Sequence, residues 1–287
     1  MAPSKIILAS LTAAILAFSS QAMAYDRIIS LYSGHTDNII ALGEQERLVA
    51  VSKNDEPQNR LSLLPHLPPK ASPESFIALK PDLVILRDQN IRLNPDLADV
   101  LRRANIEVKV IEAPSWDGFE DYLRELAPLI NAKPDKAAEL FRDACQEIKR
   151  EAVARGKGQS APKVFVEATS KELHTVTDDS WAGHLIALCG GRNAASSSVP
   201  NRKGRGVAPW GLERTIQSAA EGLDVYLLQY GPMNRTTMDE LKSRPWAGVL
   251  KNTRVAQIPE YEISRPSLLW LKKGAGKLLD IFYPQAQ

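Results

Sequence analysis

The chain has 287 residues, a formal net charge of +2 and two cysteines. Its length suits one large domain or two lobes, and its charge is too small to indicate a nucleic-acid partner. Two cysteines exclude the dense disulfide framework of a small secreted domain. Cys145 lies in a helical pattern and Cys189 precedes two glycines, so we expect two buried thiols, with their pairing left open.

The first 24 residues have the pattern of an export signal. Lys5 precedes an apolar run from Ile6 to Phe18, and the stretch ends at Ala22-Met23-Ala24, a small-x-small cleavage pattern. The run is shorter than the roughly 20 residues that span a bilayer, which argues against a transmembrane anchor. We therefore expect residues 1–24 to be a cleaved signal peptide and the mature, exported chain to begin at Tyr25.

In the first part of the mature chain, short β-rich runs alternate with helical patterns, which predicts α/β units on mainly parallel sheets. Strands are expected at residues 28–32, 48–52, 83–86 and 108–112. Helices are expected at residues 37–42, 73–79, 95–104 and 116–130. Together these elements predict an N-terminal lobe, residues 25–132.

A single long helix is expected next, because residues 134–155 contain no internal Pro or Gly and are rich in Ala, Glu, Lys and Arg. It would be roughly 30 Å long at 1.5 Å per residue. We assign residues 133–156 to this connecting helix. The stretch GKGQSAP then breaks the chain, and a strand at residues 163–168 opens a second lobe, residues 157–287.

The second lobe repeats a segment of the first. Residues 72–89 and 211–230 each have a Glu near a helix start, an Ile three residues later, and an Asp that leads into an apolar strand. The two copies need a three-residue insertion to align. The fold class that follows is α/β, with two related lobes built on mainly parallel sheets and joined by one long helix.

Common catalytic motifs are absent from the sequence. There is no Gly-x-Ser-x-Gly, His-Glu-x-x-His or Cys-x-x-Cys, and no Gly-x-Gly-x-x-Gly after a strand. Lys273-Gly274-Ala275-Gly276-Lys277 resembles a phosphate loop, but the glycine required five residues before Gly276 is Leu271. We expect this stretch to form part of an amphipathic helix.

The four histidines do not form an obvious metal site, which would need several His or carboxylate groups on facing loops. His66 lies in a Pro-rich loop and His184 in an expected helix. Only His35 and His174 are placed in loops after strands. His35 belongs to the segment from Tyr32 to His35, which we expect to be a loop between the first strand and its helix.

Ligands of open α/β sheets bind at the carboxyl ends of strands, where following helices present free amides. Arg87 to Gln89 occupy such a place. The residues that we select there as ligand-binding candidates are Tyr32, Ser33, His35, Trp116, Tyr230, Tyr261 and Arg265. Aromatic surface with a few polar and cationic groups suits a large planar or chelated ligand. Each has an alternative. Trp116 would pack on its own lobe, Tyr230 and Tyr261 would lie only at the rim of the ligand site, and Arg265 would pair with Glu262.

Four segments carry a family resemblance. They are RIISLYSGHTDNIIALGEQERLVAVS, SPESFIALKPDLVIL, HLIALCGGRNAA and WAGVLKNTRVAQIPEYEISRPS. In this order they resemble periplasmic solute-binding proteins of ABC importers for iron-siderophore complexes, haem or cobalamin. The resemblance implies a monomeric periplasmic protein without intrinsic cofactor that holds its cargo in the cleft between the lobes. It also implies that Glu74 and Glu213 dock onto the membrane permease.

The main functional hypothesis is therefore a non-enzymatic receptor that captures a metal chelate and delivers it to an ABC importer. Tyr32 or His35 would be able to ligate the metal of a bound chelate from an axial direction. A molybdate-like oxyanion, held by helix-start amides near His35 and Trp116 together with Arg265, is the alternative on the same scaffold. A secreted hydrolase using His35 and Asp37 is least favoured. The cargo's identity stays open.

Overall fold

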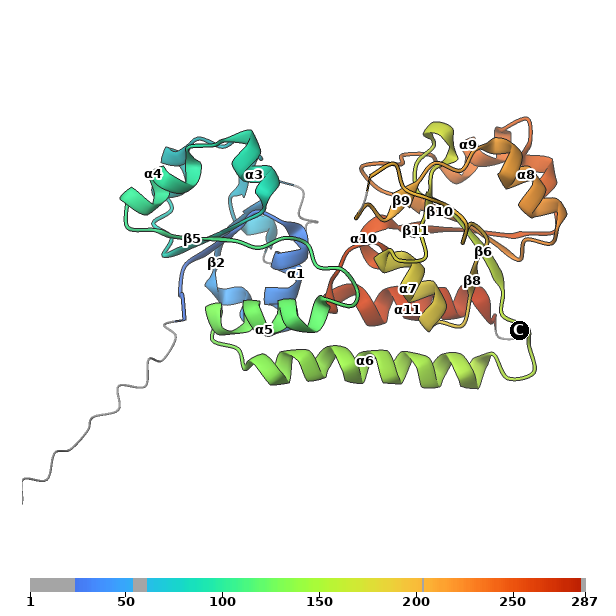
Figure 1. The fold of residues 1–287 in the computed structure, drawn as a ribbon, viewed down its shortest axis with the longest axis horizontal. Coiled ribbons are helices and arrows are strands. Elements are labelled where there is room, and N and C mark those ends of the chain that lie inside the picture. Colours follow the sequence, from blue (N-terminus) through green and yellow to red (C-terminus); the bar gives the residue numbers. More distant parts are fainter. Residues whose placement is uncertain (1–23, 54–60, 203, 285–287) are drawn as a thin grey trace, which may run out of the picture.

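Two α/β lobes lie side by side above one long helix (Figure 1). The structure, a computed structural model, describes residues 24–53, 61–202 and 204–284. Residues 1–23 of the expected signal peptide lie outside the described residues. Among the residues described, no helix is long and apolar enough to cross a membrane.

The N-terminal lobe is a parallel sheet with the strand order β3-β2-β1-β4-β5. Its strands are β1 (Ile28–Ser30), β2 (Leu48–Ser52), β3 (His66–Leu67), β4 (Leu83–Leu86) and β5 (Glu107–Val110). Its helices are α1 (Ser33–Ala41), α2 (Pro73–Ile77), α3 (Asp88–Leu93), α4 (Leu97–Arg103) and α5 (Phe119–Leu129), with short 3-10 turns at Gln45–Arg47 and Leu61–Leu63. Every residue of β1 and β4 is buried, as expected for parallel strands covered on both faces.

The C-terminal lobe has a parallel sheet with the order β11-β10-β6-β8 and a two-stranded antiparallel ribbon of β7 and β9. Its strands are β6 (Lys163–Glu167), β7 (Thr175–Val176), β8 (Arg192–Asn193), β9 (Val207–Ala208), β10 (Val225–Tyr230) and β11 (Arg254–Pro259). Its helices are α7 (Trp181–Leu188), α8 (Leu212–Ala220), α9 (Met238–Ser243), α10 (Glu260–Ile263) and α11 (Leu268–Phe282), with 3-10 turns at Lys171–Leu173 and Ala247–Leu250. The predicted fold class is confirmed.

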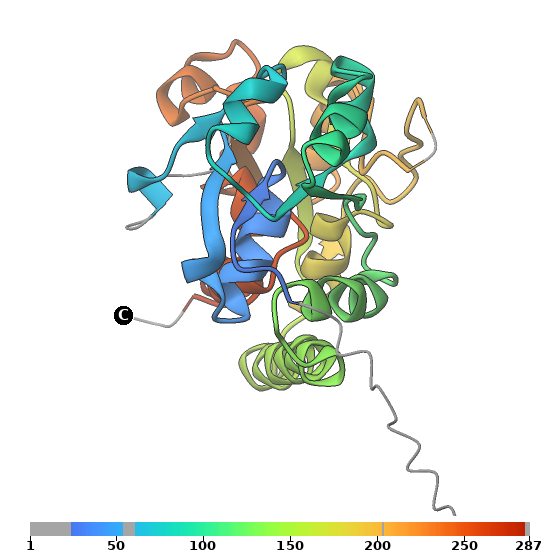
Figure 2. The same ribbon diagram turned by 90° about the vertical axis from the view of Figure 1, so that its left-hand side faces the viewer.

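The connecting helix α6 (Pro134–Arg155) has the bounds that its composition predicts. It runs beneath both lobes in Figure 1 and is seen end-on in Figure 2. One hydrophobic cluster extends from β1 through α5 and α6 to β10 and α11, so the two lobes share a continuous core along this helix. The relative position of the lobes therefore depends on side-chain packing as well as on the chain connection.

The expected loop from Tyr32 to His35 is wrong in its extent. Helix α1 begins at Ser33, four residues earlier than expected, and Tyr32 is its extended N-cap residue. The amides of His35 and Thr36 donate to the Tyr32 carbonyl oxygen, at 2.9 and 3.1 Å. Ser, Gly and His are weak helix formers, so propensity does not predict this turn; burial of all its side chains stabilises it.

The two thiols are free. Cys189 is fully buried and Cys145 is half-buried on α6. Burial raises the pKa of the Cys145 thiol to about 12, so this group stays protonated at neutral pH. The core, rather than a disulfide bond, stabilises the protein.

Candidate ligand-binding site

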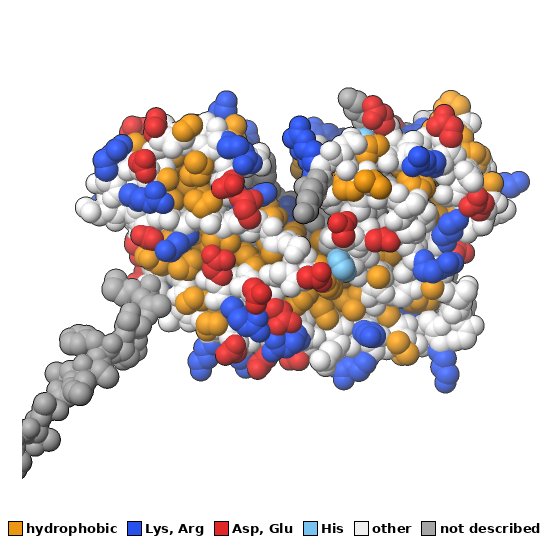
Figure 3. Space-filling view, in the orientation of Figure 1, with side chains coloured by type: hydrophobic (Ala, Val, Ile, Leu, Met, Phe, Trp, Pro, Cys, Tyr) orange, Lys and Arg blue, Asp and Glu red, His pale blue; other side chains and the backbone are white. Residues whose placement is uncertain are grey.

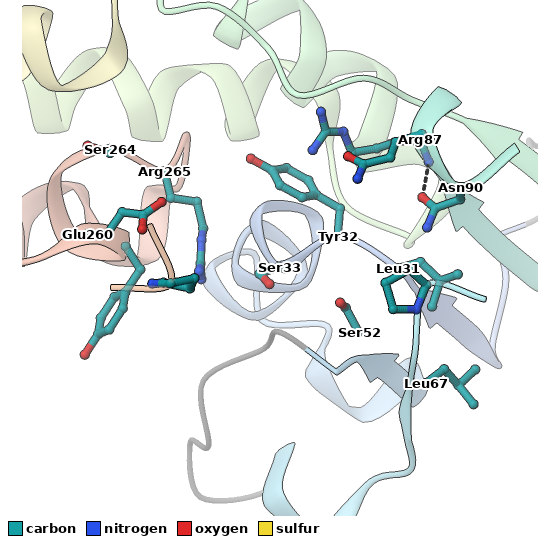
Figure 4. Close-up of a pocket in the computed structure, with 14 residues that line it drawn as sticks. Leu31, Tyr32, Ser33, Ser52, Leu67, Arg87, Asn90, Glu260, Ser264 and Arg265 are labelled. Carbon is teal, nitrogen blue, oxygen red and sulfur yellow. Dashed lines mark hydrogen bonds between the residues drawn. The ribbon is translucent and has the colours of Figure 1, made fainter. Parts of the chain in front are cut away.

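A cavity of about 280 Å³ lies between the two lobes. Figure 3 shows the molecule hollowed between the lobes, and Figure 4 shows the side chains around the cavity. The N-terminal lobe supplies the carboxyl ends of its strands, and the C-terminal lobe supplies mainly α10 and the residues that follow it. The lining residues are Leu31, Tyr32, Ser33, Ser52, Leu67, Pro69, Arg87, Gln89 and Asn90 from the first lobe and Pro232, Glu260, Tyr261, Ser264 and Arg265 from the second.

The cavity lies at the point where the strand order of the first sheet reverses. The strands β1 and β4 are neighbours, and the connections leave them toward opposite edges of the sheet. Such a switch point opens a crevice at the carboxyl ends of the strands. Tyr32 and Ser33 follow β1 and Arg87 follows β4, so the topology brings these residues together.

Tyr32 and Arg87 form a stacked pair in the cavity. The guanidinium carbon of Arg87 lies 4.5 Å from the centroid of the Tyr32 ring, within the range of a cation–π contact. Figure 4 shows both side chains at the cavity, with Arg265 approaching from the other lobe. Burial raises the pKa of the Tyr32 phenol, while Arg87 and Arg265 act in the opposite direction by favouring the phenolate.

The position of the Tyr32 ring requires glycine two residues later. A Cβ atom added to Gly34 would lie 2.4 Å from Cε1 of Tyr32. The ring therefore folds back over the first turn of α1, into space that any other residue at position 34 would occupy. Gly34 is a part of the site that a search for polar groups at strand ends does not detect.

Arg265 and α1 connect the lobes at the floor of the cavity. Nη1 of Arg265 lies 3.2 Å from Oδ2 of Asp37, whose side chain is 1% exposed. The neighbouring residue, Asn38, donates to the Pro266 carbonyl at 3.1 Å and accepts from the Leu268 amide at 2.8 Å. The alternative that Arg265 pairs with Glu262 is wrong, because Arg265 pairs with Asp37 and Glu262 pairs with lysines of α11.

His35 does not line the cavity. Its side chain is fully buried, its Nε2 is 2.9 Å from the Ile111 carbonyl oxygen, and its Nδ1 is 2.9 Å from the Tyr122 hydroxyl. Since a carbonyl only accepts, Nε2 donates to Ile111 and Nδ1 accepts from Tyr122. Burial lowers the pKa of His35 from 6.5 to about 4, so the ring is neutral at physiological pH. Both ring nitrogens of His35 therefore have partners within the protein. The His35 ring also packs edge-on against the Tyr32 ring, at a centroid distance of 4.9 Å.

Trp116 and Tyr230 also lie away from the cavity. The Trp116 ring packs against Trp181 at 4.6 Å and stacks on His184 at 5.3 Å, so it bridges the lobes below the cleft instead of packing only on its own lobe. Tyr230 is the last residue of β10 and is 47% exposed. The residues of β10 from Val225 to Gln229 are all buried, and only the strand's last residue, Tyr230, is exposed.

A second cavity of about 470 Å³ lies on the other side of α10, between the residues after β5 and the start of α7. Glu260 and Ser264 line both cavities, so the two are neighbouring parts of one cleft. The lining is more apolar on this side, with Val176, Trp181 and Met233 among its residues. Among the described residues, no group of three or more His, Cys, Asp or Glu side chains is placed to hold a bare metal ion.

A buried ion pair fixes one rim of the cleft. Glu167, at the end of β6, is fully buried, and its carboxylate accepts two hydrogen bonds from the Arg244 guanidinium, at 2.7 and 2.9 Å. Asn234 donates to the same carboxylate at 3.2 Å, and its own side chain accepts from the Thr236 amide. The loop that these residues hold carries Pro232 into the first cavity.

The two glutamates selected from the repeated segments occupy equivalent places. Glu74 lies in the first turn of α2 and Glu213 in the first turn of α8, and both side chains are exposed. Helix α8 lies on the side of its lobe opposite α6 in Figure 1, and α2 packs against α4 on the corresponding side of the other lobe. Hydrogen bonds from its own backbone amide and from the Ser72 side chain lower the pKa of the Glu74 carboxyl, so this group stays ionised.

Residues 28–261 match the family model described as periplasmic binding protein. The match covers most of the chain, including both sheets and most of the residues that line the cleft. The chain belongs to the periplasmic binding protein family. Members of this family are binding proteins rather than enzymes. The chain is the substrate-binding component of an ABC importer.

Named relatives and solved structures agree with the family. The vitamin B12-binding protein of Pectobacterium carotovorum is 29% identical over 192 residues, which span 66% of this chain and 68% of that protein. The vitamin B12-binding protein of Vibrio cholerae is 30% identical over 183 residues, or 61% and 63% of the two chains. The matched stretches thus span about two thirds of each relative.

The fold of this periplasmic binding protein matches solved structures over nearly its whole length. A possible iron-binding periplasmic protein from Staphylococcus epidermidis has a TM-score of 0.72 at 22% identity, covering 91% of this chain and 100% of that one. A periplasmic haem-binding protein from Pseudomonas aeruginosa has a TM-score of 0.71 at 19% identity, covering 92% and 94%. At these identities the likeness establishes the fold.

Proposed function

We propose that this periplasmic binding protein captures a ferric chelate that carries negatively charged groups, such as haem, and delivers it to the permease of an ABC importer. The observation that supports this cargo is the Tyr32 phenol in the interlobe cavity, stacked on Arg87 and facing Arg265. Tyrosine oxygen is among the side-chain ligands that hold haem iron. Burial raises the pKa of the Tyr32 phenol, and the two guanidinium groups partly offset this rise, which helps the phenol to lose its proton when it binds iron.

The two arginines also suit the periphery of such a cargo. Guanidinium groups bind carboxylates through paired hydrogen bonds, and Arg87 and Arg265 approach the cavity from different lobes. Arg87 has a weak partner in Glu112, at 3.4 Å and half-exposed, which a cargo carboxylate is able to replace. Leu31, Leu67 and other apolar lining residues add surface for a macrocycle.

The names of relatives support a metal chelate as cargo. Several curated relatives are vitamin B12-binding proteins, and several structures with this fold are named haem-binding or iron-binding. A small oxyanion would use few of the apolar and aromatic groups in this cleft. The cavity lining therefore favours a chelate over molybdate.

Titration of the mature chain with hemin, cyanocobalamin, a ferric siderophore and molybdate tests the cargo. We expect hemin or the ferric siderophore to bind with a changed absorption spectrum, and a Tyr32→Phe variant to lose at least about tenfold in affinity, equivalent to roughly 1.4 kcal/mol. Tyr230→Phe is the matched control, because Tyr230 lies outside the cavity, and it should bind like the wild type. Binding of molybdate or cyanocobalamin alone, or an unchanged affinity in the Tyr32→Phe variant, would contradict the proposal.

Delivery to the permease is assigned to Glu74 and Glu213, one on each lobe. Substituting both with Ala should abolish cargo uptake by cells while leaving cargo affinity unchanged, because neither residue lines the cleft. Glu139→Ala, an exposed acid on α6 at the opposite side of the molecule, serves as the control. Normal uptake by the double variant would remove these residues from the docking surface.

Export completes the proposal. Cleavage after Ala24 would leave Tyr25 as the first residue, and the Tyr25 backbone nitrogen lies 3.0 Å from the Leu129 carbonyl oxygen, so the mature N-terminus starts on the folded lobe. N-terminal sequencing of protein recovered from the periplasm should begin at Tyr25. A longer N-terminus, retained in the membrane fraction, would indicate an anchor instead.

A further inference from the structure

The wall of the cleft that comes from the C-terminal lobe is mainly the short helix α10. Glu260 and Tyr261 of this helix line the first cavity, as do Ser264 and Arg265 directly after it. A helix of four residues is too short to be stable by itself. The position of this wall is therefore determined by the elements around α10, which are chiefly α11, together with β11, from which it continues directly, and α7.

One stripe of α11 faces α10. Trp270, Lys273, Gly274 and Lys277 have the spacing i, i+3, i+4 and i+7, which places them on one face of a helix. A Cβ atom added to Gly274 would lie 2.0 Å from the carbonyl oxygen of Glu262. The two backbones are thus in direct contact, and only glycine leaves room for this approach.

Two lysines of the same stripe hold the carboxylate of Glu262. The Glu262 side chain is 1% exposed, with Lys277 Nζ at 2.5 Å and Lys273 Nζ at 3.5 Å from its two oxygens. A buried carboxylate is tolerated when cations surround it. Tyr261, the residue before Glu262, lines the first cavity.

The stripe also reaches the cleft through aromatic rings. Lys273 Nζ lies 4.8 Å from the Trp270 ring centroid, and the rings of Trp270 and Tyr261 are 4.6 Å apart. The guanidinium carbon of Arg265 lies 5.7 Å from the Tyr261 ring centroid on the cavity side. A continuous series of contacts therefore runs from Lys273 to the lining of the cavity.

We propose that the stretch Lys273-Gly274-Ala275-Gly276-Lys277 holds α10 in the cleft wall, and that Gly274, Lys273 and Lys277 are positioning residues for the cargo. The amino-acid sequence of this stretch resembles a phosphate loop, but its two lysines contact the carboxylate of Glu262 in the same chain. The proposed placement of α10 depends only on its contacts with α11. The effect on cargo rests on the proposed function, so the two are tested separately.

A pair of glycine substitutions tests the placement of α10. Gly274→Ala and Gly276→Ala make the same chemical change two residues apart in α11, but a Cβ atom at Gly276 meets nothing within 4 Å. Hydrogen exchange of the peptide spanning residues 260–267 should accelerate at least about tenfold in the first variant, since opening free energy sets exchange. It should be unchanged in the second. Equal exchange in both variants would overturn the proposal.

Binding of hemin or the ferric siderophore, whichever the wild type retains, provides the second measurement. Lys277→Met should weaken binding several-fold at temperatures well below unfolding, and Lys277→Arg should restore most of the affinity by keeping the cation beside Glu262. A Lys277→Met variant with wild-type affinity would refute the positioning role. If the wild type retains neither probe, the cargo assignment is wrong, and the exchange experiment alone decides the role of the stretch.

Discussion

Replacing Arg244 by Met should destabilise the C-terminal lobe strongly. The substitution removes the only cation in hydrogen-bond contact with Glu167 among the described residues, and the Glu167 side chain is fully buried. The Tyr226 hydroxyl and the Asn234 amide still donate to the carboxylate, but they carry no charge. Breaking a buried ion pair by removing one partner typically costs about 3–5 kcal/mol.

This cost predicts the size of the measured change. At about 2–4 °C of Tm per kcal/mol for chains of 150–250 residues, the loss corresponds to roughly 6–20 °C. Chemical denaturation followed by circular dichroism should give the free energy of unfolding directly. Cargo affinity should also fall, because the same network holds the loop that carries Pro232 into the cavity.

A second substitution separates the buried charge from the lost contacts. In the double variant Glu167→Gln, Arg244→Met, no uncompensated charge remains, so at least half of the lost stability should return. A loss of less than about 1 kcal/mol in the Arg244→Met variant, well below the range for a broken buried pair, would refute the role of the ion pair. A double variant that is less stable than the single variant would also refute it.

Two further predictions concern the support of Tyr32. The pKa of His35 is about 4 in the folded state, below its unfolded value of 6.5. The contribution of His35 to stability is therefore complete above pH 6.5 and is lost as the pH falls toward 4. This loss lowers the free energy of unfolding by about 3 kcal/mol. A His35→Gln variant should show a flatter pH dependence of the unfolding free energy in this window; an identical slope would mean that His35 is not buried as the neutral form. Gly34→Ala should displace the Tyr32 ring and lower cargo affinity at least about tenfold. Gly248→Ala, where a Cβ atom meets nothing within 4 Å, should bind normally, and equal affinities in the two variants would contradict the role of Gly34.

Much of the fold follows from local sequence patterns. The bounds of α6 are predicted because its interior lacks Pro and Gly and its composition favours helix throughout. The strands β2 and β4 are predicted with their observed bounds, since they are apolar runs between turn signals. The helical assignment of the stretch from Lys273 to Lys277 is confirmed as well.

The composition of the site is predictable only in part. Tyr32, Ser33, Tyr261 and Arg265 are identified by their place after strands, because topology alone brings strand ends to one edge of a sheet. The same criterion also selects His35, which lies in the first turn of α1 and points into the core. Strand ends fix where the backbone lies, but not which way each side chain points.

By itself, the sequence determined the order of the elements, the connecting helix and the region in which a ligand would bind, because these depend on periodicity and composition along the chain. Only the tertiary structure decided the early start of α1, the burial of His35 against Ile111 and Tyr122, and the docking of α10 on Gly274. Each of these depends on contacts between residues far apart in the sequence or on different elements. Their free energy comes from packing and from satisfying buried polar groups, which no local pattern encodes.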